Sequence, residues 1–321
     1  MRSGNPVIGL VSVLLVGSAL FAGCGGGSPA SPTSPTPLQS AAAVGGPAGA
    51  AVPELMPDEV LVGAGDIARC GVGDSEATAK LLDRIPGTVF TLGDNVQDTG
   101  SAEEYAKCFE PTWGRHRQRM LPTVGNHDWN GGNGRPYFAY FGPSAGLSGL
   151  GYYGTMLGAW HVLSLNSEIP ARAGSPQYEW LKAELAASPA ACTIAMWHEP
   201  LFTSGPSEPA ASMRDIYRLL HQHGTELVLS GHNHMYERFA PQNADGRADP
   251  SGPRQFVVGT GGYTLYGRAR AQANSEVLDT DTWGVLKLTL KSNSYSWEFV
   301  PVQGRSFRDA GSGSCSPRPA A

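Results

Sequence analysis

Residues 120–128 read Met-Leu-Pro-Thr-Val-Gly-Asn-His-Asp, an apolar run that gives way at a glycine to three polar side chains. A short apolar run bounded by a turn residue is typical of a buried strand, so the polar residues fall in the loop at its carboxyl end. The same pattern occurs where Val60–Ala64 precedes Gly65-Asp66 and where Thr88–Leu92 precedes Gly93-Asp94. Three strands, each ending in polar side chains, are therefore predicted in the first half of the chain.

The second half repeats this arrangement, with strands predicted at Trp160–Leu165, Cys192–Trp197, Glu226–Leu229, Phe256–Val258, Val285–Leu290 and Tyr295–Val300. Helices are predicted between them at Ser75–Asp83, from Ser101 with its capping-box partner Glu104, at Gln177–Ala187 and at Met213–His223. Strands that alternate with helices indicate an α/β fold. In such folds ligands bind at the carboxyl ends of the strands, where His198 and Gly231-His232-Asn233-His234 also lie.

The polar residues at these strand ends form one chemically coherent set. They are carboxylates, an amide and imidazoles, namely Asp66, Asp94, Asn126, His198, His232 and His234. One such Asp or His on its own is usually a turn or structural residue. Together they provide the mixed oxygen and nitrogen ligands that Fe, Mn or Zn bind in proteins, so we expect a metal centre.

These motifs resemble the five sequence blocks of calcineurin-like metallophosphoesterases. The blocks are Gly65-Asp66, Gly93-Asp94-Asn95, Gly125-Asn126-His127-Asp128, Trp197-His198 and Gly231-His232-Asn233-His234. Met235-Tyr236-Glu237-Arg238, directly after the last block, resembles the purple acid phosphatase branch. The resemblance runs from about residue 60 to residue 263 and implies two facing mixed sheets flanked by helices, an αββα sandwich.

The resemblance also implies a site with two metal ions, of the divalent or iron type (Fe, Zn, Mn or Ca). Asp66 and His234 would hold the first ion, Asn126, His198 and His232 would hold the second, and Asp94 would bridge the two. A hydroxide shared by the ions would attack the phosphorus atom in line with the leaving group. His127 would contact the phosphoryl group or protonate the leaving oxygen, and Asp128 would orient the His127 imidazole.

The chain departs from the family pattern at the first metal. Gln97 stands where the purple branch has a metal-binding tyrosine, and Ala68 stands where other branches have a histidine. Gln97 is a candidate ligand through its carbonyl oxygen, with water as the alternative. Without a tyrosinate we expect a colourless protein that accepts divalent ions and has a neutral-to-alkaline optimum.

The N-terminus is predicted to be a targeting segment. Arg2 precedes the apolar run Val7–Phe21, which ends in Leu20-Phe21-Ala22-Gly23-Cys24 and resembles a bacterial lipobox. Residues 1–23 are then a lipoprotein signal peptide, and Cys24 carries the lipid that anchors the protein to the membrane. An ordinary signal peptide and a secreted protein are the alternative. Residues 24–57 have the composition of a disordered tether, residues 58–303 form the catalytic domain, and residues 304–321 form a C-terminal tail.

Four cysteines remain after Cys24, and they can form two disulfides in an oxidising compartment in one of three pairings. We favour Cys70–Cys108 and Cys192–Cys315, because Cys70 and Cys108 each follow a candidate metal loop and Cys315 would tie down the tail. Four buried free thiols are the alternative.

Charge limits the choice of substrate. The formal net charge is −5 and the basic residues are scattered, which argues against nucleic acid as a partner. A phosphate monoester is the favoured substrate. A phosphodiester or a nucleotide is the alternative within the same chemistry, and a non-catalytic, metal-binding surface lipoprotein is the alternative of another class. The sequence does not specify the oligomeric state.

Overall fold

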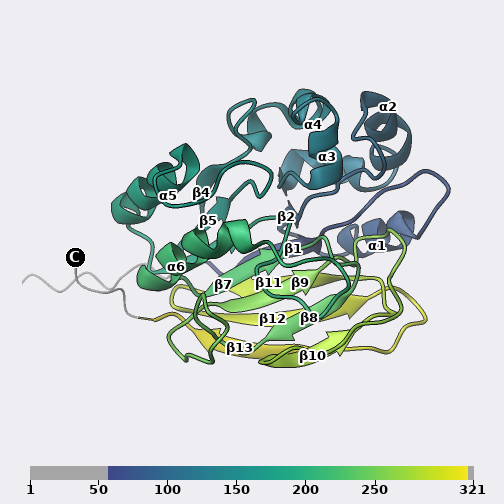
Figure 1. The fold of residues 1–321 in the computed structure, drawn as a ribbon. Helices are drawn as coiled ribbons and strands as arrows, with labels where there is room; N and C mark the ends of the chain where they lie inside the picture. The colour runs from purple at the N-terminus through teal and green to yellow at the C-terminus, as the bar shows by residue number, and fades with distance from the viewer. Residues whose placement is uncertain (1–56, 317–321) are drawn as a thin grey trace, which may run out of the picture. The chain divides into compact units, whose positions relative to one another are not determined.

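Two mixed β-sheets lie face to face in a computed structural model that describes residues 57–316 (Figure 1). The first sheet has the strand order β13-β12-β11-β1-β2-β3. Its strands are β1 (Glu59–Ala64), β2 (Thr88–Thr91), β3 (Met120–Leu121), β11 (Gly284–Leu290), β12 (Ser294–Pro301) and β13 (Ala310–Ser314). β1, β2 and β3 are parallel, so their carboxyl ends meet at one edge.

The second sheet has the order β10-β8-β9-β7-β6-β5-β4. Its strands are β4 (Tyr153–Leu157), β5 (Trp160–Ser164), β6 (Cys192–Met196), β7 (Leu227–Ser230), β8 (Tyr236–Phe239), β9 (Arg254–Val258) and β10 (Ser275–Asp279). β5, β6, β7 and β9 are parallel, while β4, β8 and β10 pair antiparallel. This sheet therefore also gathers several carboxyl ends at one edge.

Helices flank the sheets, and they are α1 (Ser75–Leu82), α2 (Ala102–Glu104), α3 (Asn126–Asn130), α4 (Arg135–Phe141), α5 (Pro176–Ala187) and α6 (Arg214–Gln222). A π-helix at Tyr105–Phe109 continues α2, and 3₁₀ turns occupy Trp113–Arg119, Gly142–Ala145 and Ala211–Met213. Ser101 and Glu104 form the expected capping box at the start of α2. The predicted αββα sandwich is confirmed.

The alternation of side chains along β6 shows how the layers hold together. Cys192, Ile194 and Met196 belong to the core between the sheets. Ala195 and Trp197 point the other way, into a second core with residues of α5 and α6. A strand that is apolar on both faces is typical of a parallel sheet covered on both sides.

Two disulfides join Cys70 to Cys108 and Cys192 to Cys315, which is the favoured pairing. Cys315 of the second disulfide lies just after β13. Residues 304–321, predicted to form a tail, therefore include β13, an edge strand of the first sheet. The expected boundary at residue 303 was therefore wrong in this respect. The predicted signal peptide, the lipidated Cys24 and the tether lie outside the described residues. None of the helices between residues 57 and 316 has the length and apolarity needed to span a bilayer.

Candidate metal centre

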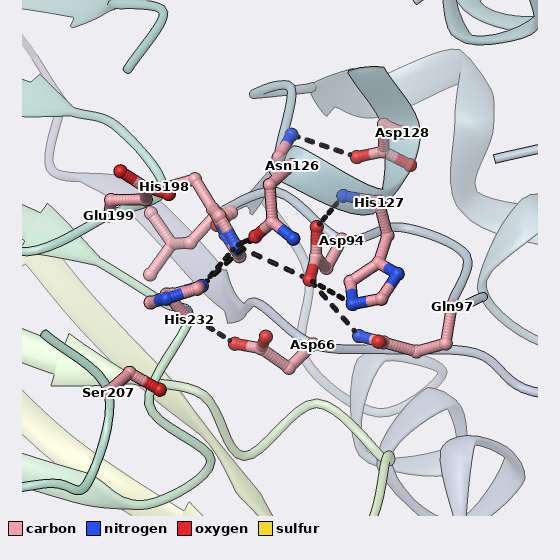
Figure 2. Close-up of polar contacts among 12 residues, drawn as sticks. Asp66, Asp94, Gln97, Asn126, His127, Asp128, His198, Glu199, Ser207 and His232 are labelled. Atoms are coloured by element: carbon pink, nitrogen blue, oxygen red, sulfur yellow. Dashed lines mark hydrogen bonds and ion pairs between the residues drawn. The ribbon is translucent and has the colours of Figure 1, made fainter. Parts of the chain in front are cut away.

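Every predicted metal ligand lies at the carboxyl end of a strand. Asp66 follows β1, Asp94 follows β2, and Asn126 opens α3 a few residues after β3. His198 follows β6, and His232 and His234 lie between β7 and β8. Pro122 has no N–H to donate, and β3 ends just before it, which leaves a loop that carries the chain to Asn126. Figure 2 shows five of these side chains pointing toward one another, namely Asp66, Asp94, Asn126, His198 and His232.

The backbone at three of these ligands is left-handed. Asp66, Asp94 and His232 have φ angles of 58°, 48° and 64°, a region that L-residues with a side chain rarely occupy. Gly93 lies close to the imidazole at the site, because a Cβ added there would lie 2.6 Å from His198 Nδ1. A glycine before the ligand thus lets two strand ends approach closely.

Four donor groups converge at the second predicted ion. The ligand atoms of Asp94, His198 and His232 all lie within 4.8 Å of one another. Asn126 Oδ1 is 3.0 Å from His198 Nε2 and 3.0 Å from His232 Nδ1. The two imidazole nitrogens are 3.2 Å apart, and His198 Nε2 is 3.3 Å from Asp94 Oδ2. The structure therefore brings together the ligands predicted for this ion.

The tautomer of His198 follows from its other nitrogen. Nδ1 lies 2.7 Å from the Leu92 carbonyl oxygen, which can only accept, so Nδ1 carries the hydrogen. In the neutral ring Nε2 then presents a lone pair toward oxygen atoms of Asp94 and Asn126. Burial alone would lower the pKa of the His198 imidazole, but the adjacent Asp94 carboxylate raises this pKa well above its ordinary value. The cluster therefore favours positive charge, which a metal ion would supply.

The site of the first predicted ion has the same arrangement with fewer groups. His234 Nδ1 lies 2.9 Å from the Thr264 carbonyl oxygen, so Nε2 faces Asp66 Oδ1 at 3.3 Å. Asp66 Oδ1 is buried and accepts no hydrogen bond from residues 57–316, whereas Oδ2 accepts one from the His232 backbone N–H at 2.8 Å. Burial lowers the pKa of the His234 imidazole, and Asp66 raises it above its usual value. An orphaned carboxylate oxygen beside a histidine lone pair fits a metal ion.

His127 lies at the edge of this cluster. Its backbone N–H donates to Asp94 Oδ1 at 2.9 Å, and its ring is 34 % exposed. Nδ1 is 3.0 Å from the Asp98 carbonyl oxygen, and Nε2 is 3.9 Å from Asp94 Oδ2. The ring is therefore close to the bridging carboxylate and still open to solvent.

The expectation that Asp128 orients the His127 ring was wrong, because the Asp98 carbonyl makes that contact. Asp128 is fully buried and accepts hydrogen bonds from the Tyr105 hydroxyl at 2.6 Å and from the Gly125 N–H at 3.0 Å. It also accepts from Asn95 and from the Val96 N–H. Burial and the neighbouring Asp94 charge raise the pKa of the Asp128 carboxyl to about 6. Asp128 thus braces the loop that carries Asp94.

Gln97 is buried beside the cluster, as its position after Asp94 suggested. Its Nε2 donates to Asp94 Oδ2 at 3.4 Å, so the amide N–H, and not the carbonyl oxygen, faces the bridging carboxylate (Figure 2). In this orientation the Gln97 amide supports Asp94, and a role as ligand through the carbonyl oxygen stays a prediction.

Several residues around the cluster belong to no sequence motif and were not predicted to lie there. Tyr266 stacks on the His234 ring with centroids 4.4 Å apart, and Tyr263 meets the same ring edge-on at 5.0 Å. Burial raises the pKa of the Glu168 carboxyl to about 7, against the pull of the nearby His198. Both tyrosines follow the glycine-rich run Gly259-Thr260-Gly261-Gly262.

Comparison with known proteins agrees with this geometry. The family model for calcineurin-like phosphoesterases matches residues 60–236. The chain is 31 % identical to purple acid phosphatase 15 of Arabidopsis thaliana over 226 residues, which is 59 % of this chain and 42 % of the relative. It is 28 % identical to the phosphoenolpyruvate phosphatase of Allium cepa over 231 residues, which is 60 % of this chain and 48 % of the relative. The chain thus spans about half the length of these curated relatives.

Solved structures share the fold. A purple acid phosphatase from yellow lupin (Lupinus luteus) seeds superposes with a TM-score of 0.67 at 20 % identity, covering 81 % of this chain and 54 % of the lupin chain. GAP50, described as the anchor in the inner membrane complex of Plasmodium, superposes with a TM-score of 0.62 at 14 % identity, covering 81 % of this chain and 89 % of that protein. The family model covers more than half of the sequence, with its motifs assembled into one cluster, so the chain belongs to the calcineurin-like phosphoesterase family.

Proposed function

We propose that this protein hydrolyses phosphate monoesters with two metal ions bound at the cluster around Asp94. One observation carries the proposal: His198 Nε2 and His234 Nε2 each face a carboxylate oxygen at 3.3 Å. Each contact is favourable only with a positive charge at Nε2, which a proton supplies in the metal-free protein and a metal ion would supply in its place. Two separate contacts of this kind suggest two ions.

The proposed ligands divide into two groups. Asp66 and His234 would hold one ion, and Asn126, His198 and His232 would hold the other, with Asp94 between them. When bound, two such ions lower the pKa of a shared water to near neutrality and neutralise charge on the phosphoryl oxygens. The carbonyl groups of Leu92 and Thr264 fix the tautomers of His198 and His234, and thereby aim a lone pair at each ion.

His127 would serve as the acid for the leaving group. Because Nδ1 keeps its hydrogen in the bond to the Asp98 carbonyl, Nε2 is the atom that takes up or gives away a proton. As the bond between phosphorus and the ester oxygen breaks, the Nε2 proton would pass to that oxygen, and the alcohol would leave. The partial exposure of the ring leaves room for a substrate on that side.

The preference for monoesters is supported by the relatives named acid phosphatase and phosphoenolpyruvate phosphatase. Purified protein should be assayed for bound metal and for hydrolysis of p-nitrophenyl phosphate and bis(p-nitrophenyl) phosphate. We expect two metal ions per chain and faster turnover of the monoester. Asp94→Ala should abolish turnover and lower bound metal at both positions, whereas Asp245→Ala, a control at a carboxylate that is 62 % exposed, should change neither.

Two results would contradict this proposal. Faster turnover of the diester would favour the alternative phosphodiesterase. Bound metal without turnover of either ester would favour a non-catalytic metal-binding protein. The fold permits that alternative, since GAP50 has the same fold and is described as an anchor.

Gln97 bears on the identity of the metals. An amide in the place of a tyrosinate does little to favour Fe(III), so the proposed ions are divalent and the proposed optimum is neutral to alkaline. A protein that purifies purple, with one tyrosinate–iron absorption band per chain, would contradict this assignment.

The proposed location is outside the cytoplasm, on a lipid anchor at Cys24. The two disulfides at Cys70–Cys108 and Cys192–Cys315 support an oxidising compartment. Cys24→Ser should release the protein from membranes with its specific activity unchanged. Retention of this variant in the membrane fraction would refute the anchor.

A further inference from the structure

Beside the metal centre, an arginine and an aspartate form a contact that the proposed mechanism does not use. Arg69 Nε lies 2.8 Å from Asp98 Oδ2. The same guanidinium donates from Nη1 to the Tyr263 hydroxyl at 3.1 Å and lies 5.8 Å from the centre of that ring. Arg69 is therefore held on two sides, and it in turn holds the side chain of Asp98.

Asp98 connects this contact to His127 through its backbone. Its φ angle of 76° is left-handed, and the carbonyl oxygen lies 3.0 Å from His127 Nδ1. Within residues 57–316 this is the only hydrogen bond that the His127 ring makes. The orientation of the ring therefore depends on a backbone conformation that an aspartate does not favour by itself.

The neighbouring contacts fix where Arg69 lies. Gln97 N–H donates to the Ala68 carbonyl oxygen at 2.8 Å, which holds the loop that carries Arg69 beside the loop that carries Asp98. Cys70, the next residue after Arg69, is bonded to Cys108 in the π-helix. The guanidinium thus approaches Asp98 from a restrained backbone.

The energetic cost of the left-handed backbone at Asp98 and the contribution of the Arg69–Asp98 ion pair are of similar size. A left-handed backbone at a non-glycine residue costs little more than a partly exposed ion pair contributes. Arg69 and Asp98 are 39 % and 45 % exposed in their side chains, so their ion pair belongs to this modest class. We therefore expect removal of the ion pair to let the Asp98 peptide relax while the loop stays folded.

We propose that Arg69 and Asp98 are positioning residues, whose ion pair holds the Asp98 carbonyl against His127 Nδ1 and so aims Nε2 at the leaving group. This inference rests on the proposed function, because it assumes that His127 acts on the substrate. Arg69 itself would not contact the phosphoryl group.

The test uses Arg69→Met, which keeps the aliphatic stem and removes the charge, with Arg69→Lys as the conservative variant. For an alkyl phosphate, whose leaving oxygen needs a proton, we expect kcat to fall about 10-fold, the lower end for loss of an outer hydrogen-bond partner. For p-nitrophenyl phosphate, whose leaving group needs little protonation, the decrease should be much smaller. KM and metal content should stay unchanged, and Arg69→Lys should recover part of kcat.

Lys107→Met is the matched control, because Lys107 lines the same surface hollow as Arg69 but pairs with Glu103. It should leave the kcat for both esters unchanged. A similar loss in Lys107→Met would mean that surface charge, and not positioning, is responsible. A rise in KM for both esters in Arg69→Met would mean that Arg69 binds the substrate. Either result would overturn the inference.

A double-mutant cycle separates this inference from the proposed function. If Arg69 acts through His127, Arg69→Met should have no further effect in the His127→Ala background. Additive effects would overturn the positioning role. If His127→Ala alone leaves kcat unchanged, the proposed acid is wrong and the inference loses its basis.

A spectroscopic measurement tests the geometry without turnover. In zinc-loaded protein, ¹⁵N NMR should assign the hydrogen of the His127 ring to Nδ1, with the signal identified by its loss in His127→Ala. Arg69→Met should shift this signal toward a mixture of tautomers. An unchanged His127 spectrum in Arg69→Met would refute the positioning role, whatever the kinetics.

Discussion

Removal of metal should destabilise the native protein, by an amount that can be estimated. A metal ion that binds only the native state, at a free concentration 100 times its Kd, contributes about 2.7 kcal/mol, so the two proposed ions contribute about 5.4 kcal/mol. In a domain of this size each kcal/mol corresponds to about 2–4 °C in Tm, so chelation of both ions should lower Tm by about 11–22 °C. The reason is structural, since without metal His198 Nε2 and His234 Nε2 face carboxylate oxygens at 3.3 Å, a contact that is favourable only while each imidazole is protonated.

The size of this effect should depend on pH. In the metal-free protein, burial lowers the pKa values of His198 and His234, but Asp94 and Asp66 raise both above the ordinary value, which is about 6.5. The resulting stabilisation is complete below that unfolded-state pKa and is lost as pH rises through the folded-state pKa. The metal-free protein should therefore lose stability above pH ~6.5, whereas metal binding improves as its ligands lose protons. The difference in Tm should widen with rising pH.

The titration of His232 changes the stability of the metal-free protein in the opposite direction, but only at lower pH. Burial and the charge of His198 lower the pKa of the His232 imidazole to about 4. Its contribution changes between that value and the unfolded-state pKa of about 6.5, and it is neutral in both states above pH 7. Measurements from pH 7 upward therefore contain no contribution from the titration of His232.

The assay is differential scanning calorimetry of chelated and zinc-reloaded protein across this pH range. Asp94→Asn, which keeps the shape and removes the charge, should lose most of the metal-dependent difference in Tm. Asp245→Asn, a control at an exposed carboxylate, should keep it. A difference that is absent in the wild type, that stays constant with pH, or that persists in Asp94→Asn would refute this reasoning.

Three further substitutions separate the roles of residues near the cluster. His127→Ala should keep its metal, by elemental analysis, while kcat falls about 10²–10⁴-fold, the range for loss of an acid; loss of metal in step with rate would make His127 a ligand. Asp128→Asn places an amide N–H₂ among several hydrogen-bond donors, so urea titration should show a destabilisation of about 2–4 kcal/mol, and no change would contradict the bracing role. Gln97→Tyr should increase iron retention and add a visible absorption band; a variant with neither would contradict the placement of residue 97 beside the first metal.

The sequence could predict that the metal ligands lie close together. Most of them follow a short apolar run that forms a strand, and a fold of this class brings the carboxyl ends of such strands together. The position of Asp98 could not be predicted in the same way. Its contact with His127 uses a backbone carbonyl, which every residue possesses, so side-chain identity carries no signal. The role of Asp128 was assigned wrongly for a related reason, since adjacency in sequence suggested a contact that the turn of α3 prevents.

Four strands were not predicted, namely β4, β8, β10 and β13, and for β10 and β13 the structure shows a physical reason. β13 reads Ala-Gly-Ser-Gly-Ser, without the apolar alternation that predicts a strand. The glycines are needed because two rings of β12 lie over this strand: a Cβ at Gly311 would come within 2.2 Å of the Trp297 ring, and one at Gly313 within 2.4 Å of the Tyr295 ring. β10 is an edge strand in which no residue is fully buried, so its pairing depends on backbone hydrogen bonds with β8. Neither strand carries a hydrophobic pattern of its own.

The left-handed backbone at Asp66, Asp94 and His232 also has an evolutionary consequence. At each position glycine would relax the chain, so selection for foldability alone should remove these three side chains first. A library of variants screened only for thermal resistance, with no catalytic requirement, should therefore accumulate glycine there. A lineage that had drifted free of its chemistry should show the same erosion at these three positions.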